Sequence, residues 1–389
     1  MATIPTDTLT SRELAIVTVA RLVLTVAFRV LYPLLPFLGD HLRVDLALVS
    51  TLVTIQLLAS LLSPVAGMLA DAYGERPLML AGLLMYVAGT LVCALDLGFT
   101  GYLVGYIGVG IALALFQPPS TAYLSARSSY ARRGRVIGIA ELSWAGAALL
   151  GVFPLMLLVE TSRSVAPVYW ILCGAGIAAL LLVWRGLPPT TRHAATRVSI
   201  DWRALTAPSA VLMLAFLGLV MLAYDLFLVA QAPWLKDTLR VSEAQLGQLF
   251  GVVGLAEMLG SLGVAFLADR LGKRRSVLLG FAVTAGLVLL LPLSAIDLWV
   301  VAVLFFALYG VMEFAIVAAI PLMSAVAPTA RGTLLALSVM VVGLGRALGA
   351  QLSVPAYQLA GMTLNAVVSV ALIVVALALV ARVREHETA

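Results

Sequence analysis

Long apolar stretches, separated by short polar segments, recur along the whole of the chain. A helix needs about 20 apolar residues to cross the hydrocarbon core of a bilayer, which is roughly 30 Å thick. Twelve stretches reach about that length, and each is predicted to form a transmembrane helix. They lie at residues 13–37, 46–70, 77–96, 99–125, 134–159, 166–187, 206–232, 243–268, 276–295, 298–325, 333–358 and 362–382. The pattern therefore predicts an all-α integral membrane protein.

A longer polar segment interrupts the apolar pattern between the sixth and seventh predicted helices. This segment, 188–204, contains two prolines and three arginines, and neither residue type extends an apolar helix. We therefore expect an N-terminal six-helix bundle at residues 1–187, a cytoplasmic linker at 188–204 and a C-terminal six-helix bundle at 205–389.

The two predicted halves repeat each other in sequence. Segment 36–45, PFLGDHLRVD, shares six identities over ten positions with segment 233–242, PWLKDTLRVS, at an offset of 197 residues. Further matches at an offset of 198 residues are Asp71 with Asp269, Gly74 with Gly272, and Arg133-Gly134 with Arg331-Gly332. Agreement in three separate loops indicates a duplicated six-helix unit. Such a duplication places a shared cavity between two pseudo-symmetric bundles, near the middle of the membrane.

Polar residues mark the starts of several predicted helices. Thr10 and Glu13 have the spacing of a capping box ahead of the first apolar stretch. Asp45 and Ser242 precede the second and eighth stretches and are expected to be N-cap residues. No small-residue cleavage site follows the first apolar stretch, so we expect no removable signal peptide.

Composition points to a lipid environment and excludes several classes of function. Of the 389 residues, 62% are apolar and 11% are charged, whereas a soluble domain has about 25% charged residues. The basic residues are spread over separate loops, which excludes a nucleic-acid interface. Cys93 and Cys173 lie in apolar stretches, and His41, His193 and His386 lack metal-ligand spacing. We expect no metal site, no cofactor and no catalytic residue.

The distribution of Lys and Arg predicts the orientation in the membrane, because loops rich in these residues stay cytoplasmic. With the N-terminus inside, the cytoplasmic segments hold 17 Lys and Arg residues and the outer loops hold four. Both termini are therefore expected to face the cytoplasm, and the chain is expected to lie in the cell inner membrane as a monomer.

Two copies of one motif follow the second and eighth predicted helices. Segment 67–76 reads GMLADAYGER, and segment 265–275 reads AFLADRLGKRR. Both resemble the Gly-x-x-x-Asp-Arg-x-Gly-Arg-Arg signature of the major facilitator superfamily. Together with the repeated six-helix pattern, this resemblance extends over essentially the full chain. Ala72 stands in place of the first arginine of the signature, and Ala265 stands in place of its glycine.

The resemblance implies two bundles that rock about a central site and a cytoplasmic latch formed by the motif. It also implies that the first, fourth, seventh and tenth helices line the cavity. Gly67 is expected to let two helices approach closely, and Gly74 is expected to permit a turn with positive φ. The predicted gating residues are Gly67, Asp71, Gly74, Arg76, Asp269, Arg270, Gly272 and Arg274.

Seven ionisable residues lie well inside the predicted helices, where each costs roughly 2.5–3.5 kcal/mol if it faces lipid. We therefore expect them to face the protein interior. We interpret the set as the substrate and proton-coupling site, and the alternative is a set of structural ion pairs that hold helices together. The seven are Arg21, Arg29, Glu141, Asp225, Glu257, Glu313 and Arg346.

Specific pairings follow from the repeat and from charge. Asp225 corresponds in the repeat to the residue before Arg29, so we predict an Asp225–Arg29 pair across the pseudo-twofold axis. Glu141 and Glu257 are predicted proton carriers, because a buried carboxylate without a partner is readily protonated. Arg346 needs a counter-charge, and Glu141 supplies one if the fifth and eleventh helices approach each other.

The predicted function is a secondary active transporter that works by alternating access and couples export of a small amphipathic or organic compound to protons. Its partners would be the small-molecule substrate, protons and the lipid bilayer. The alternatives are uptake of an organic anion, motivated by the three membrane arginines, and a non-transporting membrane sensor or assembly factor. Polar and aromatic side chains that could contact substrate are Tyr32, Gln56, Gln117, Trp144, Tyr224 and Tyr309.

Two features keep the assignment to drug exporters open. The segment Gly108-Val-Gly110 is present in the fourth predicted helix, but no arginine precedes it as in the proton-coupled drug exporters that the chain resembles. The fifth predicted helix lacks the Gly-Pro pair of those exporters over residues 144–151. An enzyme is not expected, since no nucleophile–base pair or metal constellation accompanies the helices.

Overall fold

The structure, a computed structural model, describes residues 9–189, 207–294, 296–326 and 331–383. These residues form helices joined by short loops, and strands are absent from the described parts of the chain. The helices of the first half are α1 (Ser11–Leu42), α2 (Leu46–Leu58), η1 (Ala59–Leu62), α3 (Ser63–Tyr73), α4 (Glu75–Ala94), α5 (Gly98–Ala126), α6 (Tyr130–Gly146), η2 (Ala147–Val152), α7 (Phe153–Ser162) and α8 (Ala166–Gly186).

The second half begins after the predicted linker, most of which lies outside the described residues. Its helices are α10 (Pro208–Leu228), α11 (Gln231–Leu239), α12 (Glu243–Leu271), α13 (Lys273–Leu293), α14 (Leu298–Val326) and α15 (Arg331–Val380). The described residues thus run through six membrane-length segments on each side of the linker.

Twelve membrane-spanning segments are confirmed within the described residues. Eleven helical stretches are long and apolar enough to cross a bilayer. The last of them contains a break at Ala360 and Gly361, where the backbone leaves the helical region and Gly361 takes a φ of 69°. This break separates the eleventh span from the twelfth, as the sequence predicts. Three other spans are built from consecutive helices: α2–η1–α3 and α6–η2–α7 follow each other directly, and α10–α11 are joined by a turn at Val229 and Ala230.

The predicted helix caps are present. The Thr10 hydroxyl accepts a hydrogen bond from the backbone N–H of Glu13, and the Glu13 carboxylate accepts one from the backbone N–H of Thr10, at 3.2 Å and 2.8 Å. Asp45 accepts from the N–H of Ala47 at 2.7 Å. Ser242 accepts from the N–H of Gln245 at 3.3 Å. Each side chain satisfies a backbone donor that the first turn of a helix leaves without a partner.

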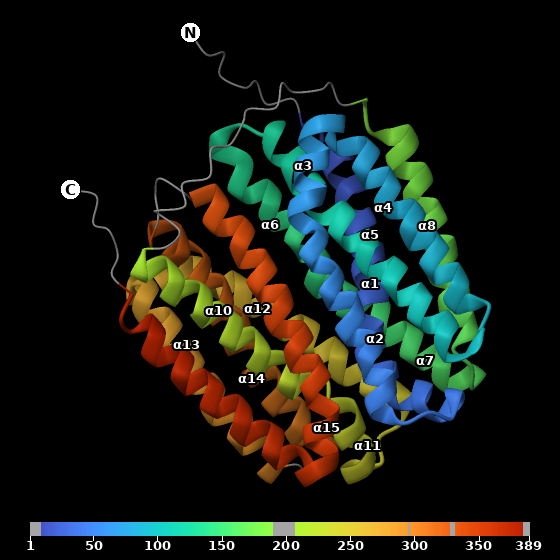
Figure 1. Cartoon of the computed structure of the whole chain (residues 1–389), viewed down its shortest axis with the longest axis vertical. Helices are drawn as coiled ribbons and strands as arrows, with labels where there is room; N and C mark the ends of the chain where they lie inside the picture. The colour runs from blue at the N-terminus through green and yellow to red at the C-terminus, as the bar shows by residue number, and fades with distance from the viewer. Residues whose placement is uncertain (1–8, 190–206, 295, 327–330, 384–389) are drawn as a thin grey trace.

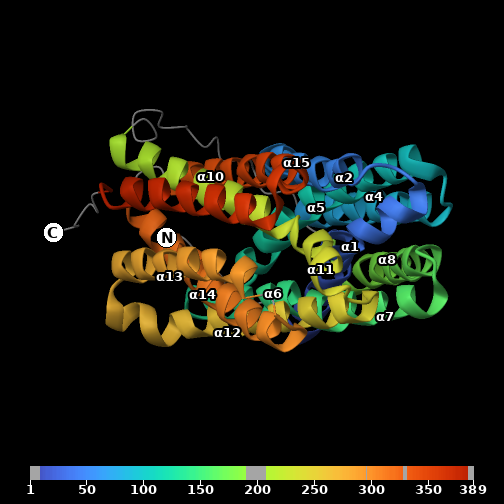
Figure 2. The same ribbon diagram turned by 90° about the horizontal axis from the view of Figure 1, so that it is seen from below.

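The helices run roughly along one direction, with the first half and the second half lying side by side (Figure 1). Seen from below, most helices of the first half lie on the right and most helices of the second half lie on the left (Figure 2). The two halves meet along two seams. In one seam α2 packs on α15, and in the other α6, η2 and α7 pack on α12. We call the end where α1 begins and α15 finishes the terminal end, and the opposite end the distal end.

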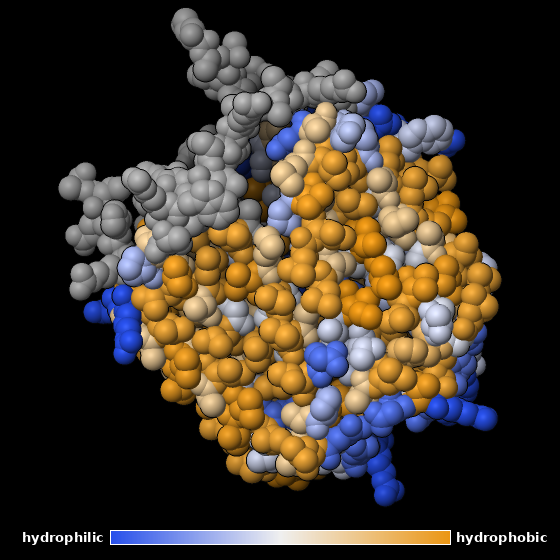
Figure 3. All heavy atoms as spheres, in the orientation of Figure 1, coloured by the Kyte–Doolittle hydropathy of each residue, from blue (hydrophilic) through white to orange (hydrophobic). Residues whose placement is uncertain are grey.

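An apolar surface covers the middle of the molecule, with polar residues concentrated towards its ends (Figure 3). Many large apolar side chains of the molecule are exposed, among them Leu84, Leu150, Trp170, Phe266 and Val303. A water-soluble protein rarely exposes a contiguous apolar area of this extent. The surface is that of a multi-pass membrane protein with lipid as its solvent.

The duplication is visible in one matched contact of each half. Arg76 donates a hydrogen bond to the backbone carbonyl of Trp184, at the end of α8. Arg274, which lies 198 residues after Arg76, donates to the backbone carbonyl of Ala381, directly after α15. A cation at a helix C-terminus binds carbonyl groups that have no partner within the helix and offsets the negative end of the helix dipole. Each motif arginine therefore fastens the last helix of its own half.

Candidate functional site

A cavity of about 850 Å³ lies between the two halves and reaches from the terminal end to the middle of the helices. Its wall extends from Arg135 near the start of α6 and Ile320 near the end of α14 to Trp144, Tyr224 and Arg346 at mid-depth. Most of the wall is apolar: Ile137, Ile139, Leu142, Ala145, Met221, Met258, Leu262, Met312, Ile316, Val317, Ile320 and Val342. A cavity of this size and lining suits an amphipathic organic molecule.

The floor of the cavity is closed by charged and aromatic side chains from both halves. Arg29 and Trp144 come from the first half, and Tyr224 and Arg346 come from the second. The space left among them and their neighbours is only about 10 Å³, which is too little for a ligand. The distal half of the molecule is therefore sealed from the cavity in this conformation.

Arg29 and Glu257 form an ion pair that joins α1 to α12 across the two halves. Two hydrogen bonds connect them, from Arg29 Nη1 to Glu257 Oε2 at 2.6 Å and from Nη2 to Oε1 at 3.2 Å. The guanidinium also donates to the backbone carbonyl of Trp144 at 3.4 Å and lies 4.8 Å from the centroid of its ring. This two-pronged geometry and the aromatic contact make a charged pair tolerable in a buried place.

Asp225 and Arg346 form a second buried pair, which joins α10 to α15 within the second half. Arg346 Nε lies 2.6 Å from Asp225 Oδ2, and Nη2 lies 3.3 Å from Oδ1. Tyr32, from α1 of the first half, donates to Asp225 Oδ1 at 3.0 Å and accepts from Arg346 Nη2 at 3.0 Å. One hydroxyl thus connects the pair to the opposite half.

The predicted Asp225–Arg29 pair is wrong in this structure, because each residue has a different partner. The repeat places Asp225 opposite the residue before Arg29. One residue along a helix turns the side chain by about 100°, since an α-helix has 3.6 residues per turn. Arg29 therefore points towards Glu257 on α12, whereas Asp225 points towards Arg346 on α15.

Arg21 and Glu141 form the third pair, at 2.6 Å between Nη2 and Oε1, and Arg21 also donates to Thr121 Oγ1 at 3.1 Å. The suggested Arg346–Glu141 contact is therefore wrong. The Glu141 side chain is 55% exposed, whereas Arg21 is buried. Because Glu141 also lines the cavity, its carboxylate is open to the cavity while its partner is not.

Glu313 is the membrane carboxylate without a guanidinium at bridging distance among the described residues. Its Oε1 accepts a hydrogen bond from the Ser261 hydroxyl at 2.9 Å, and both residues line the cavity. We expected Glu141 and Glu257 to be the unpartnered carboxylates, and the geometry corrects this because both pair with arginine. The residue best placed to exchange a proton or meet a cation is Glu313.

Several of the predicted substrate contacts gather around the floor. Trp144, Tyr224 and Tyr309 line the cavity, and Tyr32 lies below it in the contact with Arg346. Tyr309 donates to Gln231 Oε1 at 2.8 Å, so its hydroxyl is already occupied.

The two predicted glutamines lie away from the large cavity. Gln56 donates to the backbone carbonyl of Phe28 at 3.3 Å, and its side chain is buried. Gln117 accepts hydrogen bonds from the Ser120 and Thr121 hydroxyls through its backbone carbonyl. Neither glutamine lines the cavity, and the Gln56 side chain connects α2 to α1.

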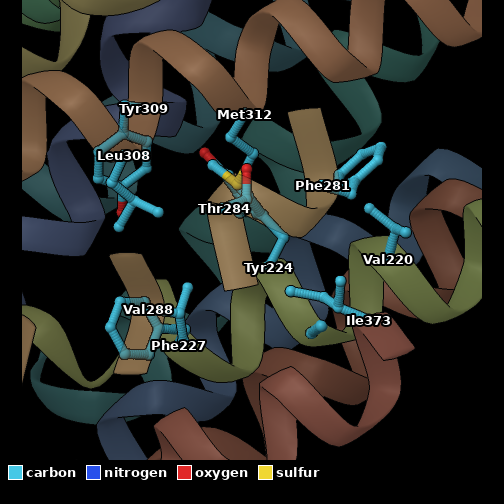
Figure 4. A pocket seen from close by; sticks show the side chains of 11 residues that line it. Val220, Tyr224, Phe227, Phe281, Thr284, Val288, Leu308, Tyr309, Met312 and Ile373 are labelled. Carbon is cyan, nitrogen blue, oxygen red and sulfur yellow. The ribbon is translucent and has the colours of Figure 1, made fainter. Parts of the chain in front are cut away.

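A small second space lies behind the cavity wall, inside the second half (Figure 4). Its volume is about 20 Å³, and it is bordered by Tyr224 and Tyr309 on the cavity side and by Phe281 and Thr284 on the other. The Thr284 hydroxyl donates to the carbonyl of Gly280 at 2.9 Å, so it is already engaged. This space has room for about one water molecule and is a packing void rather than a substrate site.

The motif residues adopt the turn that the sequence predicts, without the predicted close approach. Gly74 has a φ of 93° and Gly272 a φ of 83°, which confirms the need for glycine at these turns. A Cβ atom on Gly67 would meet nothing within 4 Å, so the expected close helix approach at this residue is wrong here. Asp71 and Arg270 are exposed. The side chain of Asp269 lies outside the described residues.

Gly67 lies in α3, at the terminal end, where the large cavity opens. Among the described residues, the wall of that cavity contains none from α3, and α3 contacts α15 of the other half. A latch at this end would close only when the halves come together there. The structure therefore has the terminal end open and the distal end closed.

Four residues that line the cavity were not predicted from the sequence: Ser261, Met221, Met258 and Met312. Ser261 lies four residues after Glu257, on the same helix face, and this spacing could have drawn attention to it. Methionine is common in apolar helices, so sequence alone gave no signal for the other three. Among the described residues, no group of three or more His, Cys, Asp and Glu side chains is arranged to hold a metal ion.

Comparisons with known proteins agree with this architecture. The family model described as Major Facilitator Superfamily matches residues 17–349 and residues 213–389. An uncharacterized MFS-type transporter of Bacillus subtilis (strain 168), YceJ, is 24% identical over 339 residues, which is 84% of this chain and 85% of that protein. The fujikurins efflux protein of Gibberella fujikuroi is 26% identical over 238 residues, which is 57% of this chain and 48% of that protein.

Two solved structures share the fold over nearly the whole chain. The human organic anion transporter MFSD10 has a TM-score of 0.69 and 20% identity, with 95% of this chain and 99% of that chain covered. A peptide transporter, POT, has a TM-score of 0.78 and 13% identity, with 97% of each chain covered. Because the family model matches most of its length, the chain belongs to the major facilitator superfamily of membrane transporters.

Proposed function

We propose that this transporter exports amphipathic organic cations in exchange for protons, with Glu313 as the group that binds either one. The observation that carries the proposal is the position of Glu313 in an apolar cavity, with Ser261 as its hydrogen-bond donor and without an arginine at bridging distance among the described residues. An ionised carboxylate in such surroundings is costly unless a cation or a proton compensates it.

The charges deep in the membrane support a cationic substrate. Three guanidinium groups, those of Arg21, Arg29 and Arg346, each have a carboxylate at 2.6 Å. Glu313 supplies a fourth carboxylate, which has no arginine at bridging distance among the described residues. Arg135 adds a positive charge to the cavity wall, but it lies near the start of α6 at the terminal end, away from the floor.

Exchange follows from competition for one carboxylate. When the cavity faces the cytoplasm, the ionised Glu313 attracts a cation whose apolar part contacts the cavity wall. When the cavity faces the opposite side, a proton displaces the cation from Glu313. The cavity then turns back to the cytoplasm with Glu313 protonated and neutral. The coupling needs no further group, since proton and substrate cannot occupy the same carboxylate together.

The direction of transport rests on the distribution of basic residues and on one relative. The loops at the terminal end carry most of the Lys and Arg residues, which supports placing the open end of the cavity and both termini in the cytoplasm of a bacterial-type inner membrane. The relative named as an efflux protein supports export over uptake. The fold neighbour named as an organic anion transporter supports the fold alone, and in this chain the three membrane arginines are already engaged.

Flux into proteoliposomes tests the proposal. Ethidium serves as the cationic probe, and anilinonaphthalene sulfonate serves as an anionic probe. With an acidic interior, we expect ethidium to be driven inward as protons leave. Inward movement of the anion driven by an acidic exterior would support organic anion uptake instead.

The matched variants are Glu313→Gln and Glu243→Gln. Glu313→Gln should abolish the gradient-driven ethidium flux. Glu243 lies at the distal end, where it contacts Lys236 within the second half, so its replacement should leave the coupling intact. Wild-type flux in Glu313→Gln under the same gradient would overturn the assignment of Glu313.

A further inference from the structure

Two polar contacts join the halves at the closed distal end. Glu160, near the end of α7, accepts a hydrogen bond from the backbone N–H of Ala244 at 2.6 Å, in the first turn of α12. On the other seam, Gln358 of α15 donates from Nε2 to the carboxylate of Asp45, at 3.2 Å and 3.4 Å. Asp45 is the N-cap of α2. Each contact therefore links the distal part of one helix to the N-terminus of a helix in the other half.

The sequence repeat relates these two contacts to each other. Gln358 lies 198 residues after Glu160, and Ser242, which precedes Ala244 in the cap of α12, lies 197 residues after Asp45. Ser242 is a hydrogen-bonding neighbour of Glu160 as well. Repeat-related residues therefore form an equivalent contact in each seam, but the hydrogen-bonding groups differ. In one seam a carboxylate accepts from a helix N-terminus, and in the other an amide donates to the capping carboxylate.

A second pair of repeat-related contacts lies at mid-depth in the same seams. A Cβ atom on Gly254 of α12 would lie 2.7 Å from the carbonyl oxygen of Ala145. A Cβ atom on Gly343 of α15 would overlap the Ser60 side chain of η1 and would lie 3.7 Å from the carbonyl oxygen of Leu57. Gly343 lies 198 residues after Ala145, and Gly254 lies 197 residues after Leu57. The halves therefore approach each other closely at two equivalent crossings, against backbone at Gly254 and against the Ser60 side chain at Gly343. The cavity lies on one side of these crossings, and the polar contacts lie on the other.

We propose that Glu160 with the N-terminus of α12, and Gln358 with Asp45, are two repeat-related latches that hold the distal end closed. The halves turn about the crossings at Gly254 and Gly343, and the latches separate when the cavity opens to the distal side. Single polar contacts near water suit this role, because water replaces them at little cost when they separate. A dry, packed seam would have to expose its apolar surface instead.

The two latches are unequal. The Glu160 latch is partly buried, and its carboxylate lies at the positive end of a helix dipole. The Gln358 contact is exposed, and its neutral amide donates to a carboxylate that already caps α2 of its own half. The Glu160 latch therefore dominates, and its loss should favour the distal-open conformation more than the loss of Gln358.

Cysteine accessibility measures the balance between the two conformations, in a background with Cys93 and Cys173 replaced by alanine. Val253→Cys reports the distal side, because Val253 is buried beneath the floor. Ile316→Cys reports the terminal side, because Ile316 lines the open cavity. With Glu160→Ala, we expect a water-soluble maleimide to label Val253→Cys about two- to fivefold faster and Ile316→Cys more slowly. A variant that is merely destabilised would raise both rates.

Glu243→Gln is the matched control, because Glu243 contacts Lys236 within one half at the same end. It should leave both labelling rates unchanged. The proposal is overturned if Glu160→Ala and Gln358→Ala leave the two rates unchanged, or if Glu243→Gln changes them as much.

A disulfide provides a second test that does not depend on weakening the protein. The double variant Glu160→Cys with Ala244→Cys should form a disulfide under mild oxidation. The cross-linked protein should not transport ethidium, and a reductant should restore the flux. Cross-linked protein that transports at the uncross-linked rate would contradict the requirement that this latch separates. This outcome is independent of Glu313, so the latch and the proposed coupling fail separately.

Discussion

The Arg29–Glu257 pair allows a quantitative test of how the two halves are held together. Both side chains are buried, at 6% and 4% exposure, and they share two hydrogen bonds of 2.6 Å and 3.2 Å. Glu257→Gln would leave a buried guanidinium without its counter-charge. Breaking a buried pair in this way costs about 3–5 kcal/mol. We expect a loss of this size in the free energy of unfolding.

The double variant Arg29→Met with Glu257→Met separates the charge effect from packing. Replacing both partners with apolar side chains of similar volume is often neutral or stabilising. We therefore expect the double variant to recover most of the stability that either single variant loses. Unfolding in mixed detergent micelles, followed by circular dichroism, gives the free energies for all four proteins of the cycle.

The reasoning would be refuted by additive losses in this cycle. If Glu257→Gln cost less than about 1 kcal/mol, as is typical of an exposed pair, the guanidinium would have to find another partner or water. If the double variant lost the sum of the two single effects, the charges would not interact. Either result would remove the pair as a connection between α1 and α12.

Two further predictions concern single contacts. Tyr32→Phe removes the hydroxyl that Asp225 shares across the halves, and it should cost about 1 kcal/mol in unfolding free energy while slowing ethidium flux. Gly254→Ala places a methyl group 2.7 Å from the carbonyl oxygen of Ala145, so it should cost about 1–3 kcal/mol and reduce transport. Its control is Gly286→Ala, because a Cβ there would meet nothing within 4 Å; wild-type flux in Gly254→Ala would contradict a crossing at this residue.

Much of the fold could be predicted from the sequence, because a bilayer imposes a length on every apolar stretch. Residues 333–382 are predicted correctly as two spans although α15 extends over both, because polar and glycine residues mark the break at Gly361. The repeat could also be predicted from the sequence, since Asp45 and Ser242 occupy equivalent positions in the two halves and both cap helices.

The pairing of charges could not be predicted, because it depends on helix rotation. Asp225 and Arg29 are nearly equivalent in the repeat, but one residue of offset directs them to different neighbours. The lack of an arginine partner for Glu313 among the described residues could not be predicted either, because it depends on which carboxylates the three arginines contact. The sequence also does not show how closely α3 packs on its neighbours, so it could not predict the open space at Gly67.

The release of protons on substrate binding tests the central claim most directly. Purified protein in weakly buffered detergent solution is mixed with ethidium over a range of pH, and the protons released are measured with a pH-sensitive dye. We expect binding to release up to one proton per ethidium, because both compete for the Glu313 carboxylate, and we expect Glu313→Gln to release none. Ethidium binding without proton release at any pH, or equal release from Glu313→Gln, would contradict the account.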